Sequence, residues 1–233
     1  MKCKVIALVV LAASSLAANL LNAQGFQFGV KGNPIIYWTK AESRKPDVKA
    51  ANEGIVVGFS YGLYGEKALS PNYAVAVGIY HHMNGVKYSV TDIDAVQASI
   101  HHKLQHITIP VSMVLRTNEI GYMTYFARFG ALLSVGVKSK GVITRGGSEL
   151  PEVPVKYNPL GVGMVMGVGG QYSLGGKTAL VGAIRFENYF MDITTKKTIT
   201  ENPANGGLGL SGYAADNVSF KPIGIGLELG VLF

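Results

Sequence analysis

Two adjacent pairs of histidines, with two aspartates between them in the chain, are the residues best suited to hold a metal ion. The six residues are His81, His82, Asp92, Asp94, His101 and His102. Imidazole and carboxylate groups are ligands of zinc and copper, and a simple hairpin register would place the two histidine pairs opposite each other. Side chains alternate across a strand, so each pair sends one histidine inward and the other outward. A polar rim where strands leave a membrane therefore accounts for the cluster better, and we expect no metal and no cofactor.

His106 together with Ser112 or Ser134 supplies residue types used in nucleophilic catalysis. That chemistry needs a nucleophile, a base and a group that orients the base, all held together by geometry. Each of these residues stands singly on the small-residue face of an alternating segment, where packing explains it more simply. The sequence contains no phosphate-binding loop, paired-acid motif or nucleophile elbow. We therefore expect no catalytic residues, and a lipid-modifying barrel enzyme is the least favoured alternative.

The segments that carry these residues repeat every two residues. Large apolar residues alternate with small or polar ones along 107–115 and again along 223–233. A strand places successive side chains on opposite faces, and a membrane barrel turns its large apolar residues toward lipid. After residue 23, no apolar run approaches the roughly 20 residues that a spanning helix needs. A soluble β-sandwich would also alternate and is the main alternative to a membrane barrel.

The pattern predicts an all-β fold, an eight-stranded antiparallel up-and-down transmembrane β-barrel. We expect its strands at about 25–36, 54–64, 73–82, 101–115, 123–138, 158–172, 178–191 and 218–233. The connections after the second, fourth and sixth strands are short, and the other four are long. Outer-membrane barrels keep short turns in the periplasm and long loops outside, so both chain ends should lie on the periplasmic side. Pro110 removes a ladder hydrogen bond from the fourth strand, where we expect a bulge or kink.

Aromatic residues are expected to form two girdles at the membrane interfaces. The periplasmic girdle would contain Phe26, Phe28, Tyr61, Tyr73, Tyr125, Tyr172 and Phe233. The outer girdle would contain Tyr37, Trp38, Phe186, Phe190 and Phe220.

The same alternation predicts a polar network in the lumen. Its members are Lys31, His106, Arg128, Arg185, Glu187 and Glu228. The last strand should lie between the first and the seventh, so Glu228 can meet Lys31 on one side and Arg185 on the other. Charges buried in so narrow a barrel must be paired. The network is interpreted as a structural plug, with a gate that opens a narrow pore as the alternative. The glycines of the sixth expected strand, at 158–172, have two possible consequences. They leave open space in the lumen, as a pore requires, or they make room for large side chains from the opposite wall, as a plug requires.

The first 23 residues have the features of a secretory signal peptide, with Lys2 and Lys4 before an apolar core. We expect Sec export, cleavage after Ala23 and a barrel domain over residues 24–233. Cleavage would remove Cys3, which is the single cysteine. Cleavage would also remove Lys2 and Lys4, which lowers the formal net charge from +7 to about +5. This excess favours anionic partners, namely outer-membrane lipid and lipopolysaccharide. The basic residues Lys40, Arg44, Lys45 and Lys49 mark the first long loop as a contact surface. Basic residues interleaved with aromatics are lacking, which argues against nucleic acid.

Four segments resemble a known family. HITIPVSMVLR at residues 106–116 is similar to the x-L-x-I-P-L-x-x-x-x-K strand of small outer-membrane barrels of Bacteroidota, with Val111 and Arg116 as departures. YFARFG at 125–130, the NAQ that ends the signal segment and the terminal GVLF also resemble that family. The resemblance is to the PorT-like group, related in architecture to OmpX-type barrels. It implies a barrel in the outer membrane and carries over no catalytic residues.

The expected function is that of a non-enzymatic integral outer-membrane barrel. The resemblance implies that such a barrel acts as an envelope scaffold or as an accessory of a type IX-like protein secretion system, because some members of the group do so. Other envelope or secretion-system proteins are then its expected partners. A narrow pore or gated channel for small solutes is the alternative.

Overall fold

The computed structural model describes residues 26–43, 49–91, 97–145, 148–149, 153–154, 158–192 and 218–233. Eight long strands dominate these ranges, and three short ones accompany them. The long strands are β1 (Phe26–Ser43), β3 (Val56–Ser70), β4 (Tyr73–Thr91), β5 (Gln97–Arg116), β6 (Met123–Arg145), β9 (Leu160–Gly175), β10 (Thr178–Tyr189) and β11 (Val218–Leu232). The short strands are β2 (Lys49–Asn52), β7 (Ser148–Glu149) and β8 (Val153–Pro154). In the described ranges, no helix has the length and apolarity needed to cross a membrane.

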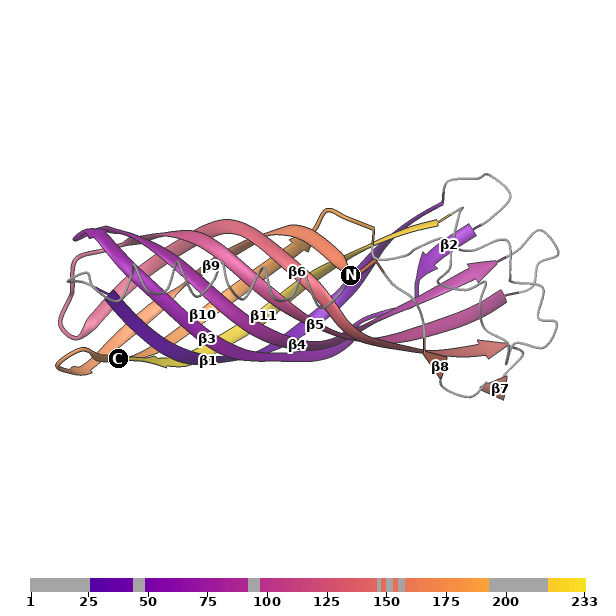
Figure 1. The fold of residues 1–233 in the computed structure, drawn as a ribbon, viewed down its shortest axis with the longest axis horizontal. Helices are drawn as coiled ribbons and strands as arrows, with labels where there is room; N and C mark the ends of the chain where they lie inside the picture. Colours follow the sequence, from indigo (N-terminus) through magenta and orange to yellow (C-terminus); the bar gives the residue numbers. More distant parts are fainter. Residues whose placement is uncertain are drawn as a thin grey trace.

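The long strands close into an antiparallel barrel (Figure 1). Each pairs with its neighbours in chain order, and β1 pairs with β11, with Gly32 opposite Leu229. Residues 71–72, 117–122 and 176–177 make the short connections, at the end of the barrel where the C-terminus lies. Gly175 and Gly176 have φ angles of 108° and 63°, which glycine adopts most readily, and they make the last of these turns. The eight-stranded up-and-down fold predicted from the alternation is therefore confirmed.

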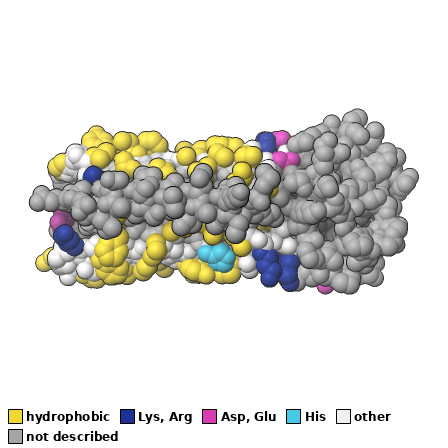
Figure 2. Space-filling view, viewed as in Figure 1, with side chains coloured by type: hydrophobic (Ala, Val, Ile, Leu, Met, Phe, Trp, Pro, Cys, Tyr) yellow, Lys and Arg dark blue, Asp and Glu magenta, His cyan; other side chains and the backbone are white. Residues whose placement is uncertain are grey.

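The outer wall of the barrel is apolar and the inner wall is largely polar. Along β3, exposed Val57, Phe59 and Leu63 alternate with inward residues such as Ser60, which is fully buried. Figure 2 shows hydrophobic side chains over the barrel surface between its two ends. At the periplasmic end, the rings of Phe28 and Phe233 lie 5.5 Å apart. This distribution is the reverse of that in a water-soluble protein, and it suits a barrel whose outside faces lipid.

Three residues assigned to the aromatic girdles lie elsewhere. Tyr37 and Phe220 are buried in the lumen, with 1% and 0% of their surfaces exposed. Their positions in the alternation explain this, because Ile36 next to Tyr37 is the residue that faces outward. Tyr61 faces outward, but it bonds His81 in the outer half of the wall instead of marking the periplasmic interface.

Several strands run further from the membrane than predicted. β1 extends to Ser43, β4 to Thr91 and β6 to Arg145, past the expected ends at 36, 82 and 138. The two-residue alternation continues there: Val86 and Tyr88 point inward, but the outward positions become polar or basic. Figure 1 shows β4, β5 and β6 projecting beyond the closed part of the barrel. Most of the expected loop between the third and fourth strands is therefore a hairpin.

Pro110 interrupts its sheet without shifting the register. The pairing of β4 with β5 skips from Val77–Val111 to Tyr80–Thr108, because proline has no N–H to donate. A register shift occurs nearby between β5 and β6, at Gln105 and His106. The expected signal peptide at 1–23, the aspartates Asp92 and Asp94 and the basic Arg44 and Lys45 lie outside the described residues.

Candidate functional site: a charged lumen

Four charged side chains from four strands meet inside the barrel around Glu228 of β11. Lys31 Nζ of β1 lies 2.9 Å from Glu228 Oε1, and Arg185 Nη1 of β10 lies 3.5 Å from Oε2. Arg128 of β6 donates a hydrogen bond to the same Oε2. All four residues are at most 4% exposed. Strand order brings these groups together, because β11 lies between β1 and β10, and the long Arg128 side chain reaches across the lumen.

A second carboxylate, Glu187, completes the ion-pair network toward the outer end. Arg185 donates from Nε to Glu187 Oε1 at 2.7 Å, and its Nη2 lies 2.6 Å from the same oxygen. The Tyr37 hydroxyl donates to Glu187 Oε2 at 2.9 Å. Arg185 therefore bridges the two buried carboxylates, and each carboxylate has at least two hydrogen-bonding partners, as buried charges require.

Two histidines form the next layer above the ion pairs. The rings of His82 and His106 stack with centroids 5.0 Å apart. His82 Nδ1 lies 3.1 Å from the Tyr37 hydroxyl, and His106 Nε2 lies 3.2 Å from the Tyr189 hydroxyl. Because Tyr37 gives its one hydroxyl hydrogen to Glu187, His82 must carry a proton on Nδ1 and donate to Tyr37. Strand β4 thus contributes a lumen residue, His82, that was assigned to a polar rim, with a metal site as the less favoured reading.

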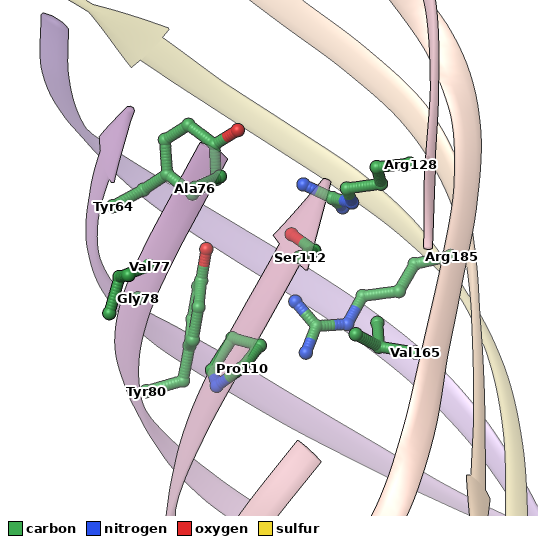
Figure 3. A pocket seen from close by; sticks show the side chains of 10 residues that line it. All are labelled: Tyr64, Ala76, Val77, Gly78, Tyr80, Pro110, Ser112, Arg128, Val165 and Arg185. Atoms are coloured by element: carbon green, nitrogen blue, oxygen red, sulfur yellow. The ribbon is translucent and has the colours of Figure 1, made fainter. Parts of the chain in front are cut away.

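Glycines on β9 make room for the two arginines. Gly167 pairs with Arg128 on one side and with Arg185 on the other. A Cβ atom at Gly167 would lie 3.0 Å from Arg128 Nε. The cavity between the two guanidinium groups, Tyr64 and Tyr80 has a volume of only about 10 Å³ (Figure 3), which holds at most one water molecule. The arginines of the two neighbouring strands, together with Tyr64 of β3 and Tyr80 of β4, fill the space beside Gly167.

Apolar side chains enclose the charged layer on both sides. A cluster near the periplasmic end comprises Tyr64, Ala74, Ala76, Val114, Phe126, Val181, Ala183 and Leu232. A second cluster toward the outer end comprises Ile35, Tyr37, Leu132 and Tyr189. Low-polarity layers of this kind strengthen the electrostatic attraction between the ion pairs they enclose.

Reasoning from the sequence missed a further ion pair at the periplasmic end. Glu66 of β3 is 2% exposed, forms a salt bridge with Arg116 of β5, and accepts a hydrogen bond of 2.6 Å from the Tyr64 hydroxyl. Glu66 was assigned to a turn. Extending the inward positions of β3 by one step, from Tyr64 to Glu66, would have placed its carboxylate in the lumen.

The two histidine pairs do not face each other as expected. His82 lies opposite His106, and His101 lies opposite Lys87, because the hairpin is longer than the sequence indicated. His102 points inward above the membrane level, where its Nε2 is 2.7 Å from the Tyr88 hydroxyl and burial lowers its pKa to about 3. Within the described parts of the chain, no three His, Cys, Asp or Glu side chains are placed to hold a metal ion.

Of the residues suited to nucleophilic catalysis, Ser112 is distant from His106, whereas Ser134 lies opposite Thr108 and diagonal to His106. His106 Nε2 is engaged by Tyr189. Ser112 lies six residues along the same strand, about 20 Å away at the usual rise of a strand. Ser134 lies over Gly161, where its Oγ would be 2.3 Å from an added Cβ atom. These positions give the three residues roles in filling the lumen.

A closed antiparallel barrel with an apolar exterior and a charged, enclosed interior is the construction of an integral outer-membrane β-barrel. The sequence pattern of the family described as "outer membrane protein beta-barrel domain" matches residues 22–194, well over half of the chain. The chain therefore belongs to this family, and the protein is located in the outer membrane. No curated protein matches the chain.

Several solved barrels resemble this chain at low sequence identity. OprG from Pseudomonas aeruginosa is 11% identical, with 90% of this chain and 97% of that chain covered and a TM-score of 0.49. Neisserial surface protein A is 14% identical, with 90% and 96% covered and a TM-score of 0.44. Ail of Yersinia pestis is 12% identical, with 90% and 100% covered and a TM-score of 0.38.

Proposed function

We propose that this protein is a non-enzymatic, non-conducting barrel that serves as an envelope scaffold or as an accessory of a type IX-like protein secretion system. The observation that carries the proposal is the dense packing of charged and aromatic side chains around Glu228 and Arg185 in the lumen. Ion pairs converge on Glu228 and Glu187, and the cavity beside Arg128 and Arg185 is about 10 Å³. A lumen packed in this way leaves the outer surface and the extracellular end for interactions with partners.

The strand extensions supply a rigid surface for such contacts. β4 and β5 remain paired up to Thr91 and Gln97, and β2 adds to the edge of β4 through Lys49–Thr91. Hydrogen bonds between the strands fix the backbone of these extensions, so less conformational entropy is lost when a partner binds there than when it binds a free loop. Other envelope proteins are the proposed partners of this surface.

Two narrower assignments belong to the same proposal. The strand HITIPVSMVLR supports membership of the PorT-like group of Bacteroidota barrels. The first 23 residues act as a cleaved signal peptide, leaving 24–233 as the barrel domain. Sequencing the N-terminus of protein isolated from outer membranes should begin at Gln24, and a chain that still begins at Met1 would contradict cleavage.

Extraction of the tagged protein from native outer membranes in mild detergent, followed by affinity purification and mass spectrometry, tests the accessory role. Stoichiometric recovery of one or more envelope proteins is the expected result. Recovery as a lone monomer, together with normal protein secretion in a deletion strain, would refute it. Steady single-channel currents from that monomer would favour the pore instead.

A further inference from the structure

A small cavity lies in the lumen between the guanidinium groups of Arg128 and Arg185 (Figure 3). Tyr80 and Ser112 also line it, and its volume is about 10 Å³. None of the ten residues described along its walls is an aspartate or a glutamate. A cavity of this size takes one water molecule or one ion of similar size. Its occupant meets guanidinium and hydroxyl groups and no carboxylate.

Particular residues of β4 and β5 produce the cavity. Pro110 interrupts the pairing of these two strands beside it, because proline has no N–H to donate. Gly78 of β4 also lines the cavity, and a Cβ atom at this position would collide with the ring of Tyr80. The proline and the glycine therefore leave a recess that the Tyr80 ring and the two arginines enclose (Figure 3).

The hydroxyl group of Tyr80 is buried beside this cavity and has no acceptor. Tyr80 is 1% exposed, and among the described residues its Oη makes no hydrogen bond. The guanidinium carbon of Arg185 lies 4.9 Å from the centre of the Tyr80 ring, but arginine can only donate hydrogen bonds. Leaving a buried donor without an acceptor is destabilising. The hydroxyl hydrogen therefore calls for an acceptor in the cavity.

The ion-pair network around the cavity carries more positive than negative charge. Its cations are Lys31, Arg128 and Arg185, and its carboxylates are Glu187 and Glu228. Every cation has a carboxylate partner, but all three share Glu228. Three positive charges therefore face two negative ones inside the barrel, where an unbalanced charge is costly.

Other described groups do not remove this excess. Glu66 is the remaining buried carboxylate of the described residues, and it pairs with Arg116. Lys31 Nζ lies 2.9 Å from Glu228 Oε1 and 3.2 Å from the centre of the Tyr64 ring. Both contacts suit a charged ammonium group. The excess therefore calls for a counter-ion, and the cavity beside the arginines has the size and lining for one.

We propose that the cavity binds a small monovalent anion of the halide class, with chloride as the natural candidate. Arg128, Arg185 and the hydroxyl groups of Tyr80 and Ser112 would donate to it. A halide accepts hydrogen bonds from all of these groups, whereas a water molecule must also donate two hydrogens of its own. The negative charge balances the three cations against the two carboxylates, so the anion is a component of the lumen plug.

Anomalous X-ray diffraction locates the anion in crystals of the protein refolded and crystallised in bromide. The expected result is a bromide peak between Arg128 and Arg185, within hydrogen-bonding distance of Tyr80 Oη and Ser112 Oγ. Electron density in the cavity without an anomalous signal would identify water and overturn the proposal. Bromide found only on the outer surface would be an adventitious ion only and would overturn it equally.

Urea unfolding in lipid vesicles tests the same site in solution. Gluconate replaces chloride at constant ionic strength, so that screening does not change. Because the anion binds only the folded barrel, each tenfold rise in chloride above the dissociation constant should lower the unfolding equilibrium constant about tenfold. Tyr80→Phe combined with Ser112→Ala should weaken this dependence. The control is Tyr88→Phe combined with Ser134→Ala, which removes two buried hydroxyl groups outside the cavity and should retain it.

Lys31→Met separates the charge argument from the local contacts. Lys31 does not line the cavity, but its removal leaves two cations facing two carboxylates, so the chloride dependence should weaken. An undiminished dependence in Lys31→Met would overturn the charge argument. A wild type without chloride dependence, or equal dependence in the wild type and the Tyr80→Phe/Ser112→Ala variant, would overturn the site. The shift in electrophoretic mobility on heating shows that each variant is folded. None of these results depends on the accessory role, because no protein partner is present.

Discussion

Replacing Glu228 with glutamine tests whether the lumen charges hold the barrel together. The substitution keeps the shape of the side chain and removes the charge that Lys31, Arg128 and Arg185 share. Arg185 keeps Glu187 at 2.6 Å, whereas Lys31 and Arg128 lose the carboxylate on which they converge. Breaking a buried ion pair costs about 3–5 kcal/mol because a charge is left without compensation. We expect Glu228→Gln to destabilise the barrel by that amount.

The assay is reversible urea unfolding in lipid vesicles, followed by the fluorescence of Trp38, the single tryptophan. With a dependence on urea of up to about 3 kcal/mol per molar, the midpoint should fall by at least roughly 1 M. Electrophoretic mobility with and without heating gives an independent measure of the folded fraction. Both readouts should move together if unfolding is a single transition.

Two variants control this experiment. Glu42→Gln breaks an exposed ion pair with Lys40 and Lys221 and should leave the midpoint unchanged, because exposed pairs contribute little. Lys31→Met combined with Glu228→Gln removes one uncompensated cation and should recover part of the loss. An unchanged midpoint for Glu228→Gln alone would refute the argument that the lumen charges are coupled.

Other predictions concern packing and pH. Gly167→Val should destabilise the barrel by about 1–3 kcal/mol, because the added side chain overpacks against Arg128. Gly182→Val is the control and should not destabilise it, because the space around its added Cβ is open. Equal urea midpoints for the two variants would show that Gly167 does not make room for Arg128. His102 has a pKa of about 3 in the folded chain and about 6.5 when unfolded, so its contribution to stability is present above pH 6.5 and is lost as pH falls toward 3. His102→Asn should therefore reduce the pH slope of unfolding by up to about 1.4 kcal/mol per pH unit in that window, and identical slopes in urea titrations from pH 7 to 4 would contradict the assignment.

The sequence was sufficient to predict which face of each strand is inward, because that property repeats every two residues. It brought Glu228, Lys31 and Arg185 together from strand order alone. Register between strands also depends on turn type and loop length, which the alternating pattern alone does not give. The longer hairpin of β4 and β5 therefore moved His101 away from His81, although each residue keeps its predicted strand.

Strand ends were also hard to predict, since β-structure continues where the apolar residues stop. Outward positions of β4 change from Met83 to Lys87 while the inward Val86 and Tyr88 continue to pack. The membrane therefore sets where large apolar residues end, and interior packing sets where the strand ends. Tyr37 was assigned to the outer girdle by residue type, although its position in the alternation points inward.

The lumen as a closed plug is the central claim, and conductance across planar lipid bilayers tests it most directly. Folded, heat-modifiable wild-type barrel should insert without producing current steps, because ion pairs and apolar clusters fill its interior. A reproducible series of equal steps in the wild type, present in samples of unaltered mobility, would contradict the filled lumen and restore the pore as the function of this protein.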